Sequence, residues 1–185
     1  FTITHIGLMN ADRNPKMLWE ELSEIISENK EFAADFELKL IGKIDTSVIN
    51  DISKHKLTKN VQIIDYVTHD KVVEFQQKSQ VLLLIVNNVP SAKGIITGKI
   101  FEYLMAKRPI LAIAPTNGDL AEIIKETNGG LVVDFEDNNT LKLAILDLYD
   151  KFKHGNLKAD SKNIAQFHRK ELTKKVSELI YKITE

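Results

Sequence analysis

The sequence contains no cysteine and no excess of either charge, and it has no long apolar run. The missing cysteines exclude a disulfide scaffold, a thiolate zinc site and a cysteine nucleophile. Lys and Arg total 25 against 26 Asp and Glu, which argues against a protein whose main partner is the nucleic-acid backbone. The densest apolar run, Val81 to Val86, is much shorter than the ~20 residues of a membrane-spanning helix. The opening residues also lack a signal-peptide pattern, so we expect a cytoplasmic protein.

Several nucleotide and metal motifs are missing as well. There is no G-x-G-x-x-G fingerprint and no Walker sequence, which disfavours nicotinamide, flavin and P-loop proteins. No Asp-x-Asp pair follows an expected strand, and no two histidines have metal-ligand spacing. We therefore expect neither an essential metal nor a resident cofactor. His5 lies within the first expected strand, where a place in the core or at a sheet edge is the simplest interpretation.

The 185 residues, 43% of them hydrophobic, are sufficient for one globular domain. Strand and helix patterns alternate, which predicts βαβ units in a doubly wound, mostly parallel Rossmann-like sheet with helices on both faces. The expected strands are 1–6, 36–41, 61–64, 81–86, 109–114 and 131–133. The expected helices are 16–29, 45–52 after an Asp45 cap, 69–78, 98–106, 117–126, 138–152 and 161–184, with residues 128–130 tolerating positive φ where the fifth helix ends.

We expect a single domain over residues 1–185, closed by C-terminal helices, with 160–185 as a helical tail. The tail either packs across the sheet edge or reaches toward another domain. Phe1 opens directly into a strand pattern, which favours a fragment of a longer protein; a processed or trimmed N-terminus is the alternative.

Ligands of open parallel sheets bind beyond the carboxyl ends of the strands. This rule selects the loops 7–13, 65–69, 87–98 and 115–119. In the first loop, Gly7 permits close approach of a ligand, and Arg13 offers a forked donor for phosphate oxygens. On these residues alone, a tight turn at Gly7 and a solvated Arg13 are the simpler interpretation.

The start of the helix expected at 98–106 is the most informative segment. Thr97 and Gly98 lie where free N–H groups and the helix dipole favour an anion. Lys99 follows in the first turn, where a cation is unfavourable for the dipole, so a phosphate is one reason for its presence. Glu102 lies one turn further and can accept two hydroxyl hydrogen bonds, as a ribose offers. Taken singly, Glu102 is more simply a carboxylate that stabilises the helix.

The combination of motifs resembles the group 1 (family-4-like) glycosyltransferases of the GT-B fold. Glu102-Tyr103-Leu104-Met105-Ala106 followed by Pro109-Ile110 matches their donor-site phrase E-[YA]-[LM]-A-x-x-x-P-[IV]. Further segments resemble those of the family in the same order, so that the resemblance covers nearly the whole chain. They are Leu40–Gly42, Asn60–Val67, Gly118–Ile124, Asn128–Asp134 and Phe167–Ile180. The chain resembles the C-terminal, nucleotide-sugar-binding half of such an enzyme, without the N-terminal acceptor half.

The resemblance implies a role for each candidate site residue. Lys99 and, less closely matched, Arg13 would neutralise the diphosphate leaving group, and Gly7 would line the donor site. Glu102 would bind the ribose hydroxyls. The backbone amides around Ile96, Thr97 and Gly98 would hold phosphate oxygens, and the backbone of Tyr66 and Val67 would meet the base.

The implied function is transfer of a sugar from a nucleoside-diphosphate sugar to a glycan or lipid-linked acceptor, as in polysaccharide biosynthesis. This half alone is expected to be inactive. Gly94 replaces a glutamate that usually contacts the donor sugar, so the sugar stays open, as do the base, the acceptor, the stereochemical outcome and the oligomeric state. No nucleic-acid partner is expected. Weak association of the full-length enzyme with the inner membrane face is left open.

Two alternatives have different chemistry. A GT-B-like nucleotide-sugar epimerase would need acid/base carboxylates and histidines at the cleft, which this half does not offer. A non-enzymatic flavodoxin-like signalling domain would need an acidic pair after the first strand and a lysine after the fifth. Asp65 follows the third strand as such a domain requires, but Gly7-Leu8 and Pro115 occupy the other positions.

Overall fold

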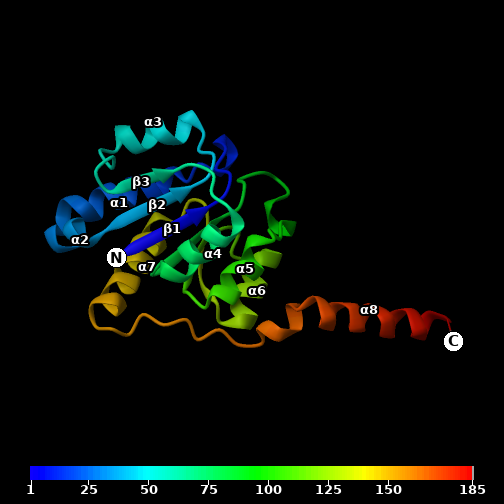
Figure 1. The fold of residues 1–185 in the computed structure, drawn as a ribbon. Coiled ribbons are helices and arrows are strands. Elements are labelled where there is room, and N and C mark those ends of the chain that lie inside the picture. Colours follow the sequence, from blue (N-terminus) through cyan, green and yellow to red (C-terminus); the bar gives the residue numbers. More distant parts are fainter. Residues whose placement is uncertain (185) are drawn as a thin grey trace.

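The computed structural model describes residues 1–184, and its centre is a parallel sheet (Figure 1). The six strands run in the order β3-β2-β1-β4-β5-β6, and every neighbouring pair is parallel. The alternating pattern therefore predicted the doubly wound sheet correctly. The strands are β1 (Thr2–Ile6), β2 (Glu37–Ile41), β3 (Val61–Ile64), β4 (Val81–Ile85), β5 (Ile110–Ile113) and β6 (Gly130–Val133).

Helices cover both faces of the sheet. One apolar core contains residues of α1, α2, α3 and α7, and a second contains residues of α5 and α6; α4 packs beside α5. The α-helices are α1 (Lys16–Glu28), α2 (Lys30–Asp35), α3 (Thr46–Lys54), α4 (His69–Lys78), α5 (Lys99–Ala106), α6 (Asp119–Thr127), α7 (Asn138–Lys153) and α8 (Arg169–Thr184), with 3-10 turns η1 (Ala11–Arg13), η2 (Ala92–Gly94) and η3 (Ile164–Phe167).

Most helix boundaries agree with the sequence patterns. The Asp45 side chain accepts a hydrogen bond from the N–H of Ser47 at 2.9 Å and caps α3, as expected. The expected helix 16–29 agrees with α1, but the sequence analysis did not predict the separate helix α2 after it, which the Asn29 side chain caps by accepting from the N–H of Phe32. The expected helix 161–184 is wrong at its start: residues 161–163 are irregular, η3 follows, and α8 begins at Arg169.

The turn after α6 differs in part from the expectation. Asn128 is left-handed, with φ of 49°, as predicted. Gly129 and Gly130 do not have positive φ. Gly130 begins β6, and a Cβ there would lie 1.9 Å from the carbonyl oxygen of Ile110, so its glycine permits close strand approach.

The sheet opens between β1 and β4. β1 pairs with β2 from Thr2 opposite Glu37 to Ile6 opposite Ile41, but with β4 only at Ile3–Val81 and Thr4–Leu82. Side chains replace the missing pairing: the Nδ1 of His5 lies 3.1 Å from the Leu83 carbonyl oxygen, and the N–H of Ile6 donates to the Tyr103 hydroxyl at 3.2 Å. The two strands thus separate toward their carboxyl ends at the point where the winding direction reverses.

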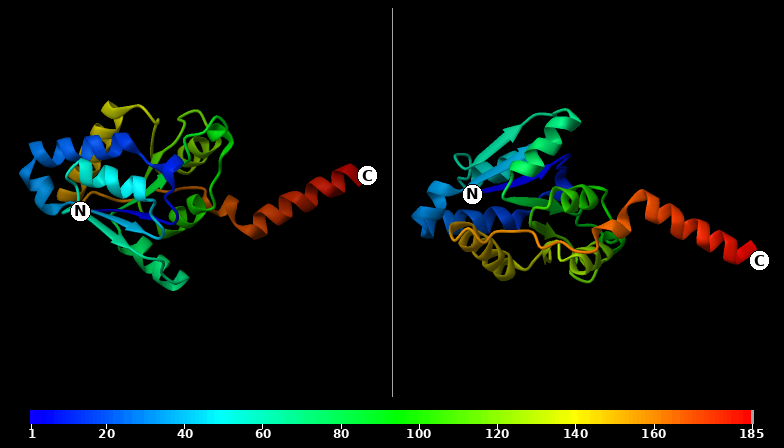
Figure 2. Two further views of the ribbon diagram at one scale, coloured as in Figure 1. Left: turned by 90° about the horizontal axis from the view of Figure 1, so that it is seen from above. Right: turned by 60° about the horizontal axis from the view of Figure 1, so that its bottom comes forward.

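The C-terminal helix α8 extends away from the sheet and its covering helices in every view (Figures 1 and 2). Its side chains from Arg169 to Ile183 are exposed, so it does not pack across the sheet edge. Whether it reaches toward another domain, as in the second expectation, stays a prediction. Over residues 1–184, no helix has the length and apolar character needed to cross a bilayer.

We expect Gly130→Ala to destabilise the domain by ~2 kcal/mol or more, because its methyl group would meet the backbone of β5. Gly94→Ala is the matched control, since a Cβ at Gly94 has no atom within 4 Å and its φ is not positive. Urea unfolding of both variants measures the difference. Equal midpoints for Gly130→Ala and the wild type would contradict the close approach.

Candidate functional site

The opening between β1 and β4 is the topological switch point, where ligands bind in open α/β sheets. The loop after β1 forms one side of it, and the loop after β4 forms the other. The N–H of Asn88 donates to the Asp12 carbonyl oxygen at 2.9 Å and joins these loops. The structure thus brings together the first and third of the loops selected from the sequence.

Lys99 crosses this opening and lies against Gly7. Gly7 has a φ of +118°, and a Cβ added there would be 2.6 Å from the Lys99 Nζ. The glycine is therefore needed both for its backbone conformation and for the space that the lysine fills. Burial lowers the pKa of Lys99 to about 8, and repulsion by Arg13 adds to this, while Glu102 opposes it.

Arg13 supplies a second cation from η1. Its Nη1 donates to the Leu8 carbonyl oxygen at 2.8 Å, which folds the side chain back over its own loop. Burial lowers its pKa as well. Two cations that repel each other across one opening are stabilised by any anion that binds between them.

His5 lies beneath these cations, fully buried. Burial, followed by the charge of Lys99, lowers its pKa to about 3. Its Nδ1 faces the Leu83 carbonyl oxygen, which requires a proton on Nδ1, so Nε2 carries the lone pair. The imidazole is accordingly neutral and adds no third positive charge.

Buried polar atoms without a partner gather at the same place. Buried polar groups are almost always hydrogen-bonded, so such a gathering marks a position for water or a ligand. Among the described residues, the unpartnered atoms at the ends of β1 and β4 are His5 Nε2, Asn10 Oδ1, Arg13 Nε and Asn87 Oδ1; Ser161 Oγ lies elsewhere.

The start of α5 offers main-chain donors. Within residues 1–184, the N–H groups of Ile96, Thr97, Gly98 and Lys99 donate to no protein acceptor, whereas the next one, of Ile100, donates to the Thr97 carbonyl oxygen at 3.1 Å. A Cβ at Gly98 would have no atom within 4 Å, so the space beside Gly98 is open. With the helix dipole and the Lys99 ammonium, they form an environment suited to an anion.

Glu102 lies one turn further along α5 and faces α4 rather than Gly7. The Nε2 of the buried Gln76 donates to its Oε2 at 3.2 Å. Glu102 lines a hollow of about 440 Å³ between α4 and α5, together with His69, Val73, Phe101 and Met105. The charge of Glu102 raises the pKa of Lys99, but the hydrogen bond that Glu102 accepts comes from Gln76 on α4.

Tyr66 and Val67 lie in the loop between β3 and α4, just before His69 of this hollow. The Tyr66 side chain is 88% exposed, and Val67 is half-buried. Only their backbone was predicted to contact a base, and the exposed loop leaves that backbone accessible.

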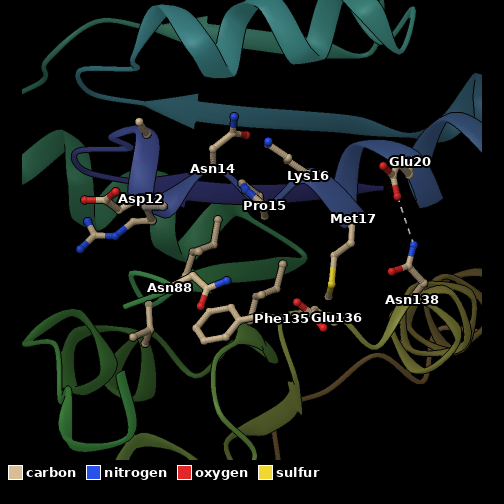
Figure 3. A pocket seen from close by; sticks show the side chains of 15 residues that line it. Asp12, Asn14, Pro15, Lys16, Met17, Glu20, Asn88, Phe135, Glu136 and Asn138 are labelled. Carbon is tan, nitrogen blue, oxygen red and sulfur yellow. Dashed lines mark hydrogen bonds between the residues drawn. The ribbon is translucent and has the colours of Figure 1, made fainter. Parts of the chain in front are cut away.

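Arg13 also lines a cavity of about 490 Å³, together with residues that follow β1, β4 and β6 (Figure 3). Ile85, Ile113 and Phe135 give it an apolar lining, and Asn88 and Asn138 add carboxamides. The sequence analysis missed the contribution of Phe135 and Glu136, in the β6–α7 loop, and of Asn138, at the start of α7. The rule that selected the other loops could have found them, because they follow directly after a strand. Nowhere in residues 1–184, this cavity included, do three His, Asp or Glu side chains gather as a metal site would require.

The family model described as group 1 glycosyl transferases matches residues 1–151. The chain belongs to this family. No curated protein sequence matches it significantly.

Solved structures show that the fold is that of a GT-B glycosyltransferase domain. Sucrose-phosphate synthase from Thermosynechococcus elongatus superposes with a TM-score of 0.72 at 17% identity, covering 99% of this chain and 45% of the synthase. The pneumococcal O-GlcNAc transferase GtfA, solved with UDP and GlcNAc, has a TM-score of 0.66 at 16% identity, covering 100% of this chain and 36% of GtfA. This chain thus spans less than half of either protein.

A third structure matches over a more equal length. It is the C-terminal domain of the group 1 family protein LpcC from Francisella tularensis. It has a TM-score of 0.66 at 13% identity, and the match covers 91% of this chain and 85% of that domain. Membership of a transferase family favours the transferase interpretation over the signalling alternative.

His5 makes the stability of the domain depend on pH. Its pKa is about 3 when folded against 6.5 for the ordinary side chain, so below pH 6.5 the unfolded chain binds the extra proton. Stability is therefore lost as the pH falls from 6.5 toward 3, at up to ~1.4 kcal/mol per unit. We expect His5→Gln to have a flatter profile between pH 7 and 5, measured by urea unfolding. The exposed His154→Gln is the control, and parallel wild-type and His5→Gln profiles would refute the assignment.

Proposed function

We propose that this domain binds the nucleoside-diphosphate part of a sugar donor and stabilises the diphosphate as it leaves. One arrangement carries the proposal. The Lys99 ammonium lies on Gly7 and interacts with the charge of Arg13, and the N–H groups of residues 96–99 at the start of the same helix have no acceptor among the described residues. Breaking the sugar–phosphate bond builds negative charge on the departing diphosphate. Fixed cations and N–H donors directed at that charge lower the energy of the transition state.

The nucleoside would extend from this anion site toward α4. Glu102 would accept the ribose hydroxyls, and the backbone of Tyr66 and Val67 would meet the base. This order follows the spacing along α5, with Lys99 in its first turn and Glu102 one turn later. Two neighbouring structures, of GtfA and of TarM from S. aureus, are complexes with UDP, which supports a nucleotide donor here.

The sugar would lie beyond Arg13, toward the cavity of Figure 3. At Gly94, where the family usually has a glutamate, a Cβ would have no atom within 4 Å, so the space beside this backbone is open to a ligand. We propose that a glycan or lipid-linked acceptor binds on an N-terminal domain outside this chain, and that transfer needs both domains and neither metal nor cofactor. A cytoplasmic location, with weak membrane association of the full-length enzyme left open, stays a prediction.

Calorimetric titration of the domain with UDP, GDP and ADP tests the proposal. We expect at least one of them to bind. Glu102→Ala should lower the affinity for that nucleotide by ~10-fold, since a hydrogen bond to a charged group is lost. Glu126→Ala, which removes an exposed carboxylate from α6, is the control. Absence of heat with all three nucleotides at millimolar concentration would reject the function.

Lys99→Met should lower the affinity for the same nucleotide by ~10-fold or more, because the ammonium nearest the diphosphate is removed. The pKa of about 8 adds a pH test: the wild-type affinity should fall as the pH rises above 8, since the neutral amine no longer attracts an anion. Lys99→Met should lack this dependence, and Lys125→Met on α6 should keep it. An identical decline in Lys99→Met would show that another group titrates.

A further inference from the structure

Gln76 is a buried polar residue that the proposed mechanism has not used. It lies on the inner side of α4, with 4% of its surface exposed, while its neighbour Gln77 is exposed. Its Nε2 donates to the Oε2 of Glu102 at 3.2 Å. A carboxylate only accepts hydrogen bonds, so the amide must direct its nitrogen, not its oxygen, toward Glu102.

The contact leaves half of the carboxylate unused. Within residues 1–184, no protein donor bonds to the Oε1 of Glu102, and the side chain is exposed toward the hollow between α4 and α5. A glutamate on a helix surface otherwise samples several rotamers, and ordering it for a ligand costs conformational free energy. A buried partner that is already ordered removes part of that cost in advance.

The identity of the partner also suits a hydroxyl ligand. An arginine or lysine at this place would neutralise Glu102 and compete for both of its oxygens. Gln76 is uncharged, so it orients the carboxylate and leaves its negative charge for other donors. Since the hydroxyl groups of a ribose are such donors, the pair forms a preorganised acceptor for a vicinal diol.

We propose that Gln76 is a positioning residue that holds Glu102 ready for the 2′- and 3′-hydroxyl groups of the nucleotide. This inference rests on the proposed function, because it assumes that Glu102 contacts the ribose. It adds a specificity that depends on α4: the domain selects ribonucleotides over nucleotides without these hydroxyls, and Gln76 sets the size of that preference.

The experiment compares two ligands on four proteins. The ligands are the tightest-binding member of the UDP, GDP and ADP panel and its 2′,3′-dideoxy form. The proteins are the wild type, Gln76→Met, Gln76→Glu and the matched control Gln77→Met. Methionine keeps the length of the side chain without the donor, and glutamate places a repelling charge against Glu102. Circular dichroism selects a temperature at which all four proteins are folded.

The expected result is a loss of discrimination rather than a general loss of binding. Gln76→Met should lower the ratio of ribo to dideoxy affinity by ~5-fold, and Gln76→Glu should lower it further. The dideoxy affinity itself should change little, and Gln77→Met should keep the wild-type ratio. If the role of Gln76 were merely structural, Gln76→Met would lower the affinity for both ligands equally.

Each other outcome overturns a specific statement. A wild-type ratio retained in folded Gln76→Met or Gln76→Glu refutes the positioning role and leaves the proposed function intact. A wild type without ribo preference refutes the contact of Glu102 with ribose, and this inference with it. A wild type that binds no nucleotide refutes the proposed function as a whole.

Discussion

The early separation of β1 from β4 is the constraint on which the rest of the site depends. The strands pair at Ile3 and Thr4 and then part, so the sheet itself creates the opening at its carboxyl edge. Backbone groups left unpaired there would be costly, and side chains take their place. The His5 ring faces the Leu83 carbonyl oxygen, and the Tyr103 hydroxyl accepts from the N–H of Ile6. These side chains hold the strands apart in a defined geometry.

The charges of the site follow from that opening. Lys99 fills it and lies on Gly7, so the ammonium is withdrawn from water and destabilised by Arg13. His5 stays neutral underneath, which limits the accumulated repulsion. A compact pair of cations that Glu102 offsets only in part is unfavourable for the empty domain and favourable for one that binds a diphosphate. The repulsion lowers the stability of the empty domain, and its relief adds to the affinity for an anion.

The sequence predicted this arrangement unevenly. Strand patterns and the carboxyl-end rule placed Gly7 and Arg13 in one loop at this edge of the sheet, and Lys99 in the first turn of the helix after another, because local periodicity determines where each strand ends. Gln76 was not found, since its burial depends on α4 packing beside α5, a contact between segments separated in sequence. The helix α2 was missed because the expected helix was ended at Asn29, and the six residues of α2 have only Phe32 buried, too little for a helical pattern. Phe135 and Asn138 were missed because the carboxyl-end rule was applied only as far as the loop after the fifth strand.

The sheet divides the interior into two separate cores. Arg13 lies just before α1, which packs in one core, whereas Lys99 begins α5, which packs in the other. A diphosphate bound by both Arg13 and Lys99 would link the helical layers on the two faces of the sheet. Since such a ligand is lost when either layer opens, its binding energy would oppose partial as well as complete unfolding, and occupancy would make the melting of the domain more cooperative.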